Sequence, residues 1–178
     1  VFDLVRQAGI PCDAEQTGWL HVAHDDASAA MLRARAQAWQ KLGRPVAFLE
    51  EREARERTAA RLCRGALLDP SGGMVNPLAL VHGLARLALA AGAAVHENAP
   101  AADVRQDGSG WRVSVGARSV SARTVLLCTN AFREGVARRL GSRFVPLPVY
   151  QIATVPLPAA EAARIAPSRN PLADTRAN

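Results

Sequence analysis

The spacing of apolar and polar positions predicts helices and strands in alternation along the first half of the chain. Residues 18–23 alternate as in a half-buried strand. Asp25 or Asp26 is placed to cap the helix that follows, and Gly43 to end it. The charged stretch 50–62 predicts a second helix that is polar on most faces. A short strand at 65–68 and a turn at 69–73 follow.

The clearest helical pattern begins after Asn76, which suits the N-cap, and Pro77 suits the first helical position. Gly92 suits the residue just past the end of this helix. Gly83 lies inside it and costs about 1 kcal/mol relative to alanine. We therefore expect something to pack closely at Gly83, and we predict a sheet. Residues 93–96 then predict a short strand.

An antiparallel ribbon is predicted next. Residues 101–104 are extended, Asp107 and Gly108 form a turn, and residues 111–122 form the antiparallel strand that runs back beside them. The ribbon leads into 125–128, which are apolar on consecutive positions. A run of this kind is typical of a strand covered on both faces in a parallel sheet.

The last third of the chain is interrupted by prolines. Residues 131–140 predict a short helix, and 144–157 predict bent or edge strands. Another helix is expected at 159–165, with no clear pattern after it. The fold class is therefore mixed α/β, with one layered unit around residues 76–142.

Composition narrows the class of protein. Of the 178 residues, 49% are hydrophobic and 21% are charged, which is typical of a globular chain. No apolar run approaches the roughly 18 residues that span a bilayer, and no secretory pattern opens the chain. We expect no membrane partner. The sequence begins at Val1 inside a helix-like pattern, so we expect a piece of a longer protein.

The net charge of +6 invites a nucleic-acid interpretation, but its distribution argues against one. Lys41 is the only lysine, so 22 − 1 = 21 basic residues are arginines, and they are scattered along the chain. The cluster at 52–57 is interleaved with glutamates, as on a solvated helix. Aromatic residues make up only 4%. We predict no nucleic-acid partner, and a basic nucleic-acid-binding domain stays as an alternative.

Cysteine and histidine show no metal-ligand spacing. Cys12, Cys63 and Cys128 are odd in number and widely separated. This usage predicts no metal site and a reduced, cytoplasmic compartment. His21 and His24 would point to opposite faces of a strand, as surface or partly buried residues.

A series of short motifs follows a fixed order and spacing along the chain: 73–77, 83–85, 92–97, 111–113, 122–132, 145–157 and 173–176. Together they cover almost the whole chain. In this order and spacing they resemble the FAD-dependent oxidoreductases of the D-amino-acid oxidase superfamily. The last two motifs, 145–157 and 173–176, are similar to the subgroup that includes γ-glutamylputrescine oxidases.

This resemblance implies two interleaved domains. Residues 76–142 would form the central part of a discontinuous FAD-binding domain. Residues 1–75 and 143–178 would belong to a β-rich substrate domain. Uncovered strand edges in such a partial domain favour a homo-oligomer or aggregation.

The resemblance also implies where the cofactor and substrate bind. The backbone of Ala101 would pass the adenine side of FAD. The Cys128, Thr129 and Asn130 turn would face the ligand crevice at the carboxyl end of a parallel strand. For Asn130, a plain strand-ending turn residue is an equal alternative.

The implied reaction is oxidation of a CH–NH group in a small amine or amino acid, with hydride passing to FAD and an imine remaining. Tyr150 and Gln151 are the candidate substrate-binding residues, with a half-buried sheet residue as the alternative for Tyr150. No catalytic residue is identified. Asp174 and Arg176 are either a salt-bridged pair or ordinary tail residues.

The dinucleotide fingerprint G-x-G-x-x-G does not occur in this sequence. We therefore expect the chain alone to be inactive, to retain no FAD and to purify colourless. The alternatives are a non-catalytic binding or scaffold module and another flavin or nicotinamide oxidoreductase that shares the layered unit.

Overall fold

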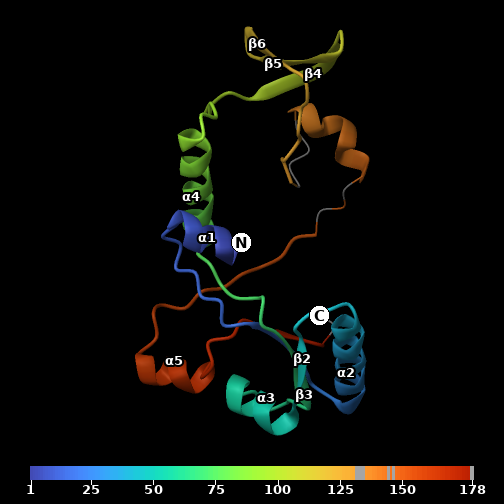
Figure 1. The fold of residues 1–178 in the computed structure, drawn as a ribbon, viewed down its shortest axis with the longest axis vertical. Coiled ribbons are helices and arrows are strands. Elements are labelled where there is room, and N and C mark those ends of the chain that lie inside the picture. The colour runs from blue at the N-terminus through green and yellow to red at the C-terminus, as the bar shows by residue number, and fades with distance from the viewer. Residues whose placement is uncertain (131–134, 144, 146, 177–178) are drawn as a thin grey trace. The chain divides into compact units, whose positions relative to one another are not determined.

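The computed structural model describes residues 1–130, 135–143, 145 and 147–176 (Figure 1). The chain divides into two compact units. The first unit comprises Val1–Ala93 and Thr154–Asn178, and the second comprises Ala94–Ala153. Both contain helix and sheet, so the predicted mixed α/β class is confirmed.

The first unit contains a four-stranded sheet in the order β2-β3-β1-β7. Strand β3 (Gly65–Asp69) pairs antiparallel with both β1 (Trp19–Ala23) and β2 (Ala47–Glu50). Strand β7 (Leu172–Asp174) pairs parallel with β1, at the edge of the sheet. The predicted strands at 18–23 and 65–68 are confirmed. The predicted helix at 50–62 is shorter: β2 takes up Glu50, and the helix ends at Thr58, where Ala59 follows in the left-handed conformation with φ +53°.

Two helices cover opposite faces of this sheet because successive side chains of a strand point to opposite sides. Helix α2 (Asp26–Lys41) packs on the face that carries Ala23 and Leu67. The Asp25 carboxylate accepts a hydrogen bond of 2.7 Å from the Ser28 backbone N–H, which confirms the predicted cap. Helix α3 (Glu51–Thr58) covers the other face. The buried cluster on that face consists of Leu20, Val22, Leu49, Ala54, Cys63 and Ala66.

Helix α4 (Pro77–Ala90) has the predicted start, since the Asn76 side chain accepts a hydrogen bond of 3.1 Å from the Ala79 backbone N–H. One face packs against the segment after helix α1 (Phe2–Ala8), in a cluster that includes Ile10. Gly83 does have a close neighbour, but that neighbour is Ile10 and not a sheet.

The tail of the first unit contains two further elements. Helix α5 (Ala159–Ile165) confirms the predicted helix. Strand β7 was not predicted, because three residues carry too little local pattern and the pairing partner lies about 150 residues earlier. Asn170 holds β7 beside β1, since its buried Nδ2 donates to the backbone oxygens of Thr17 and, at 3.1 Å, Gly18.

The second unit is built on the predicted antiparallel ribbon. Strands β4 (Ala101–Asp107), β5 (Gly110–Val115) and β6 (Arg118–Ala122) form a three-stranded sheet in chain order. The 3-10 helix η1 (Gly135–Arg143) contacts β4. Residues 131–134 of the predicted helix 131–140 lie outside the described residues, and the rest belongs to η1.

Three predicted strands are wrong. Residues 93–96, 125–128 and the described part of 144–157 carry no strand. Phe144 and Pro146 lie outside the described residues. A strand needs a hydrogen-bonding neighbour, and within the described residues no strand pairs with these apolar segments. As a result Leu126, predicted to be covered on both faces, is 82% exposed.

Candidate functional site

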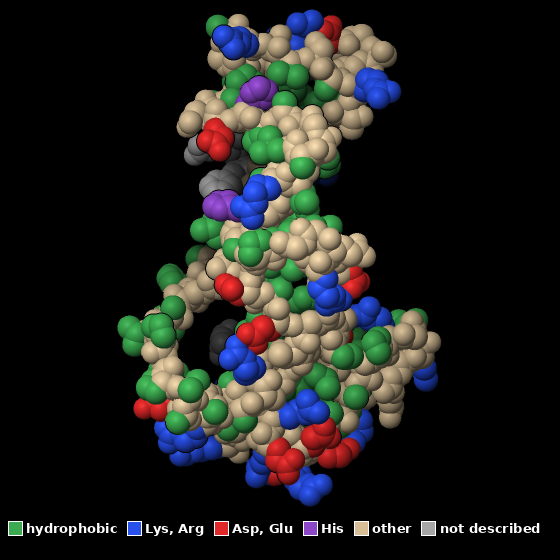
Figure 2. All heavy atoms as spheres, turned by 60° about the vertical axis from the view of Figure 1, so that its left-hand side comes forward, with side chains coloured by type: hydrophobic (Ala, Val, Ile, Leu, Met, Phe, Trp, Pro, Cys, Tyr) green, Lys and Arg blue, Asp and Glu red, His purple; other side chains and the backbone are tan. Residues whose placement is uncertain are grey.

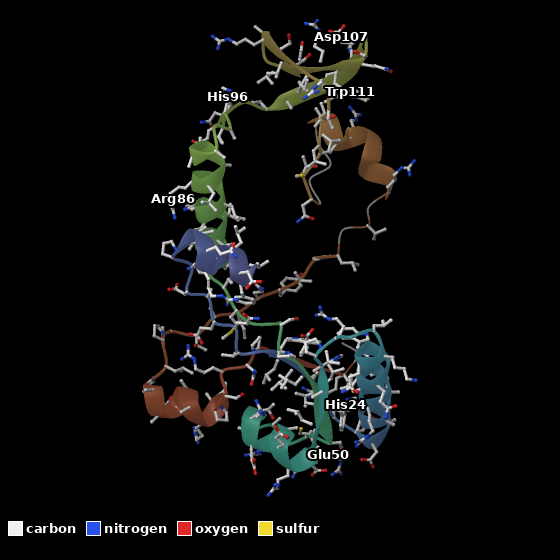
Figure 3. All side chains as sticks on the ribbon, viewed as in Figure 1. His24, Glu50, Arg86, His96, Asp107 and Trp111 are labelled. Carbon is white, nitrogen blue, oxygen red and sulfur yellow. The ribbon has the colours of Figure 1, made fainter. Side chains whose placement is uncertain are left out.

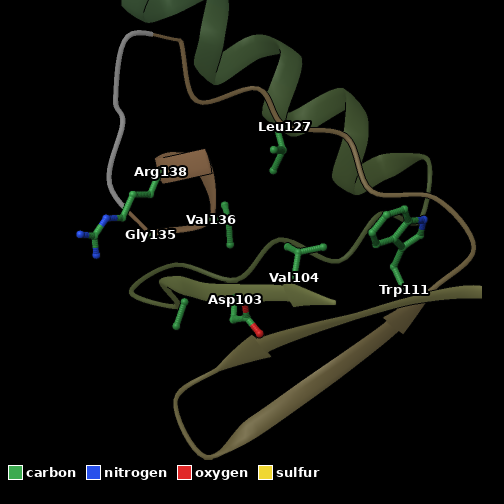
Figure 4. A pocket seen from close by; sticks show the side chains of 8 residues that line it. Asp103, Val104, Trp111, Leu127, Gly135, Val136 and Arg138 are labelled. Carbon is green, nitrogen blue, oxygen red and sulfur yellow. The ribbon is translucent and has the colours of Figure 1, made fainter. Parts of the chain in front are cut away.

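A cavity of about 710 Å³ lies within the second unit (Figure 4). This volume is in the range of small-molecule sites. Apolar side chains from β4, from the segment after β6 and from η1 form much of its wall, with Trp111 at one end and Arg138 at the other. These apolar residues are Val104, Leu127 and Val136.

The sheet and η1 set the shape of this cavity. Trp111 stands near the β4–β5 turn (Figure 3), paired in register with Gln106 on one side and Ala122 on the other. Gly135 has φ +58°, and a Cβ there would lie 2.9 Å from the Ala101 carbonyl oxygen. Glycine therefore allows η1 to begin in close contact with the first residue of β4.

The predicted cofactor residues border this cavity along the chain. Ala101 precedes the lining residue Ala102, and Cys128, Thr129 and Asn130 follow the lining residue Leu127. The three residues 128–130 are exposed, and Asn130 has φ +49°, which suits a turn. They do not end a parallel strand, contrary to the prediction. Their contact with a cofactor stays a prediction.

The predicted substrate residues are not part of this cavity. Tyr150 is 92% exposed and lies in a segment without strand structure, as does the exposed Gln151. The predicted half-buried sheet environment of Tyr150 is therefore wrong. A role in binding substrate stays a prediction.

Asp174 and Arg176 form the salt-bridged pair that was one of the two expectations. The Asp174 carboxylate also accepts a hydrogen bond of 3.0 Å from the Arg176 backbone N–H. The side-chain hydrogen bond from Arg176 is the main reason that the pKa of Asp174 lies below its usual range.

Charges of both signs are mixed around helix α3. Figure 2 shows basic and acidic side chains interspersed around α3 and not gathered into one basic patch. Ion pairs on this helix join Arg55 to Glu51 at 2.9 Å and Arg57 to Glu53 at 3.1 Å. Across the described residues, no three potential ligands gather as a metal site would require. In that same part of the chain, no helix combines the length and apolarity needed to cross a bilayer.

The described residues fit part of an FAD molecule. The apolar wall and Trp111 suit a planar ring, and Arg138 lines the far end with its guanidinium directed away from the other lining side chains. The close approach of Gly135 to Ala101 keeps main-chain groups next to the cavity. A glycine-rich turn for the pyrophosphate does not occur in the 178 residues. The described residues therefore fit a planar ring at one end of FAD and supply no glycine-rich turn for its pyrophosphate.

Sequence reasoning missed the wall of this cavity. Trp111 is predicted as a strand residue within a matched motif, with no site role, and Val136 and Arg138 are predicted only as part of a helix. The matched motif 111–113 is the signal that could have pointed to Trp111, whereas Val136 and Arg138 lie in no matched motif. The pattern of apolar and polar residues does not show which of these side chains would point into the cavity.

Comparison with known proteins defines the class. Residues 1–177 match the FAD dependent oxidoreductase family, abbreviated DAO. The match covers nearly the whole chain, so the chain belongs to this family, and the resemblance found in the sequence is confirmed.

Two curated relatives are similar to this chain. Glycine oxidase of Geobacillus kaustophilus (strain HTA426) is 30% identical over 154 residues, which cover 84% of this chain and 40% of that protein. Gamma-glutamylputrescine oxidoreductase of Escherichia coli (strain K12) is 29% identical over 152 residues, covering 84% and 35%. The chain thus spans about two fifths or less of the length of these relatives.

Solved structures agree with this assignment. Glycine oxidase from Geobacillus kaustophilus superimposes with a TM-score of 0.64 at 27% identity, covering 79% of this chain and 38% of that one. L-proline dehydrogenase from P. horikoshii gives a TM-score of 0.65 at 20% identity, covering 73% and 35%. The second similarity concerns the fold alone.

Proposed function

We propose that these 178 residues form the middle part of an FAD-dependent oxidoreductase that oxidises a CH–NH group of a small amine or amino acid. The observation that carries the proposal is a cavity of nucleotide-binding size next to Ala101, in a chain of an FAD-dependent family. The names of the relatives, glycine oxidase and gamma-glutamylputrescine oxidoreductase, support the substrate class.

The proposed roles follow the cavity wall. The main chain at Ala101 and the turn 128–130 border the adenine end of FAD, and Trp111 offers a flat face to the ring. When bound, the flavin accepts the hydride of the C–H bond, and loss of the N–H proton to water leaves an imine. Tyr150 and Gln151 are proposed to contact the substrate.

We further propose that residues 76–142 belong to the FAD-binding domain, and that 1–75 and 143–178 belong to the substrate domain. Cofactor affinity then requires a pyrophosphate-binding turn that these residues do not contain. Residues 1–178 alone are expected to retain no flavin and to show no oxidase activity.

The proposal includes the cell compartment and the state of assembly. Three free cysteines, with Cys12 and Cys63 buried, support the reducing cytoplasm. Exposed apolar side chains such as Ile152, 99% exposed, and Val149, 83% exposed, support self-association of the isolated chain. Light scattering after gel filtration tests this: a mass of one chain at micromolar concentration contradicts it.

The visible spectrum tests the functional proposal. Residues 1–178 are incubated with excess FAD and desalted, in parallel with the protein from the complete natural reading frame. We expect flavin bands in the second sample only, with turnover of glycine or of γ-glutamylated amines. Flavin retained by residues 1–178 contradicts the expectation that they hold no cofactor, and their inactivity is then tested by an assay with polyamines and amino acids. A complete protein that stays colourless and inactive supports a scaffold module instead.

A further inference from the structure

The first unit holds a second cavity, of about 230 Å³, at the edge of its sheet. Its wall combines the edge strand β7, the strand β1 beside it and the loop after α3. It belongs to a different unit from Tyr150 and Gln151, the proposed substrate residues. Nothing proposed so far uses it.

The inner wall of this cavity is apolar. Val22 is buried beneath it, while Leu62 and Leu172 are 66% and 46% exposed. Ala60 adds a small apolar side chain to this wall. Hydrocarbon that covered these side chains would remove apolar area from water, which is favourable. The inner wall is therefore suited to a small apolar group of a ligand and not to a charged one.

The rim carries one charge of each sign, from Asp174 and Arg176. The Arg176 Nε donates to the Asp174 carboxylate over 2.8 Å, and its Nη2 bonds to the same oxygen. Its Nη1 has no partner within the described part of the chain, so the guanidinium keeps donors for a second anion. The two side chains are 34% and 59% exposed, so a ligand can reach both.

The rim is held in place relative to the inner wall. The Thr175 backbone N–H donates to the Val22 carbonyl over 3.1 Å, continuing the β1–β7 pairing. Its hydroxyl lies 2.7 Å from Nδ1 of His24, a residue labelled in Figure 3, and accepts a 3.3 Å hydrogen bond from the His24 backbone N–H. Thr175 lies between the two charged residues. Binding therefore requires little ordering of the protein.

We propose that this cavity binds a free α-amino acid with a small apolar side chain, in its zwitterionic form. The ammonium group pairs with Asp174, the carboxylate pairs with Arg176, and the side chain covers Leu62 and Leu172. The head groups of the ligand complete a square of alternating charges with the protein pair, so neither protein charge loses its partner. This function goes beyond the proposed oxidase reaction and does not require the flavin.

Calorimetric titration of residues 1–178 with L-valine tests the proposal. Two matched probes each lack one head group: isobutylamine has no carboxylate, and 3-methylbutanoate has no ammonium. We expect saturable binding of L-valine in the millimolar range, and binding of either probe weaker by about fivefold, as expected for loss of one exposed ion pair. No saturable binding of L-valine, or equal binding of all three compounds, overturns the proposal.

Variants place the binding in this cavity. Arg176→Gln and Asp174→Asn are each expected to weaken L-valine binding by about fivefold. Arg33→Gln is the matched control, because it removes an exposed ion pair with Glu50 elsewhere on the same unit, and it should leave binding unchanged. An equal loss in the control overturns the proposal.

A further variant keeps the test valid if a substitution of Asp174 or Arg176 weakens binding only by detaching β7. Leu62→Ser changes an exposed loop residue that β7 does not need, so the fold should persist. We expect it to weaken L-valine binding and to leave glycine binding unchanged, because glycine has no side chain to cover Leu62. Unchanged L-valine binding in Leu62→Ser, with Asp174→Asn unfolded, overturns the proposal.

Discussion

Replacing Gly83 by alanine tests the packing of α4 most sharply. A Cβ at this position would lie 2.2 Å from Cγ2 of Ile10 and 3.1 Å from its Cγ1. Non-bonded carbon atoms rest at about 3.5–4.0 Å, so one side of the contact must move by roughly 1.5 Å. Ile10 is only 7% exposed and is packed among Val5, Cys12 and Leu87, so it has little room to move.

The size of the effect follows from two opposing terms. Overpacking a core costs about 1–3 kcal/mol, and a displacement this large belongs near the upper end. Alanine in place of glycine in a helix contributes about 1 kcal/mol in the other direction. We therefore expect Gly83→Ala to lower the free energy of unfolding by about 2 kcal/mol, even though it improves helix propensity.

The assay is urea unfolding followed by far-UV circular dichroism, with hydrogen exchange of the α4 amides as a local measure. Ile10→Ala is the partner variant and should itself cost about 2–5 kcal/mol. In that background Gly83→Ala should stabilise by about 1 kcal/mol, because the obstructing methyl groups are gone. A coupling energy of about 3 kcal/mol follows. The same effect of Gly83→Ala in both backgrounds would refute the contact.

Three further predictions concern other parts of the chain. Asn170→Ala removes the two hydrogen bonds from Nδ2 to the backbone oxygens of Thr17 and Gly18, just before β1, and should lower the free energy of unfolding by about 2 kcal/mol in urea titrations. No change would show that Asn170 does not hold β7. The pKa of Asp174 is lowered in the folded chain, so the ion pair with Arg176 stabilises the fold above the unfolded pKa, and this stabilisation is lost as pH falls through the folded pKa. Arg176→Gln should raise the pKa of Asp174 toward its ordinary value in a carboxyl NMR titration. An unmoved pKa would contradict the pairing. Cys128 is exposed and the other two cysteines are buried, so a thiol reagent should modify Cys128 rapidly in the folded chain and the others only in denaturant; fast reaction of all three would contradict the fold.

The elements that the sequence predicted correctly are those with local signals. Asn76 and Pro77 mark the start of α4, and the Asp107 and Gly108 turn marks the ribbon of the second unit. The strands predicted at 93–96 and 125–128 had a suitable apolar pattern. They fail as strands because pairing is a property of two segments, and local pattern reports only one.

The sites were less predictable for the same reason. Ala101 and the turn 128–130 came from family resemblance, and the structure adds Trp111 and Arg138 at the cavity between β4, the segment after β6 and η1. The second cavity depends on Asp174 reaching β1 from about 150 residues away. No periodicity within either segment encodes such a contact. Only the register of β7 on β1 brings Asp174 and Arg176 to the apolar wall.

The most direct test of the account is the flavin content of the complete protein when its proposed adenine cavity is altered. Leu127 lines the cavity, whereas its neighbour Leu126 is 82% exposed and does not. Leu127→Asp places a charge against the apolar wall, and Leu126→Asp adds the same charge outside it. We predict that Leu127→Asp purifies with much less bound flavin than the wild type, while Leu126→Asp keeps its full content. Equal flavin content in the two variants would contradict the assignment of this cavity to FAD.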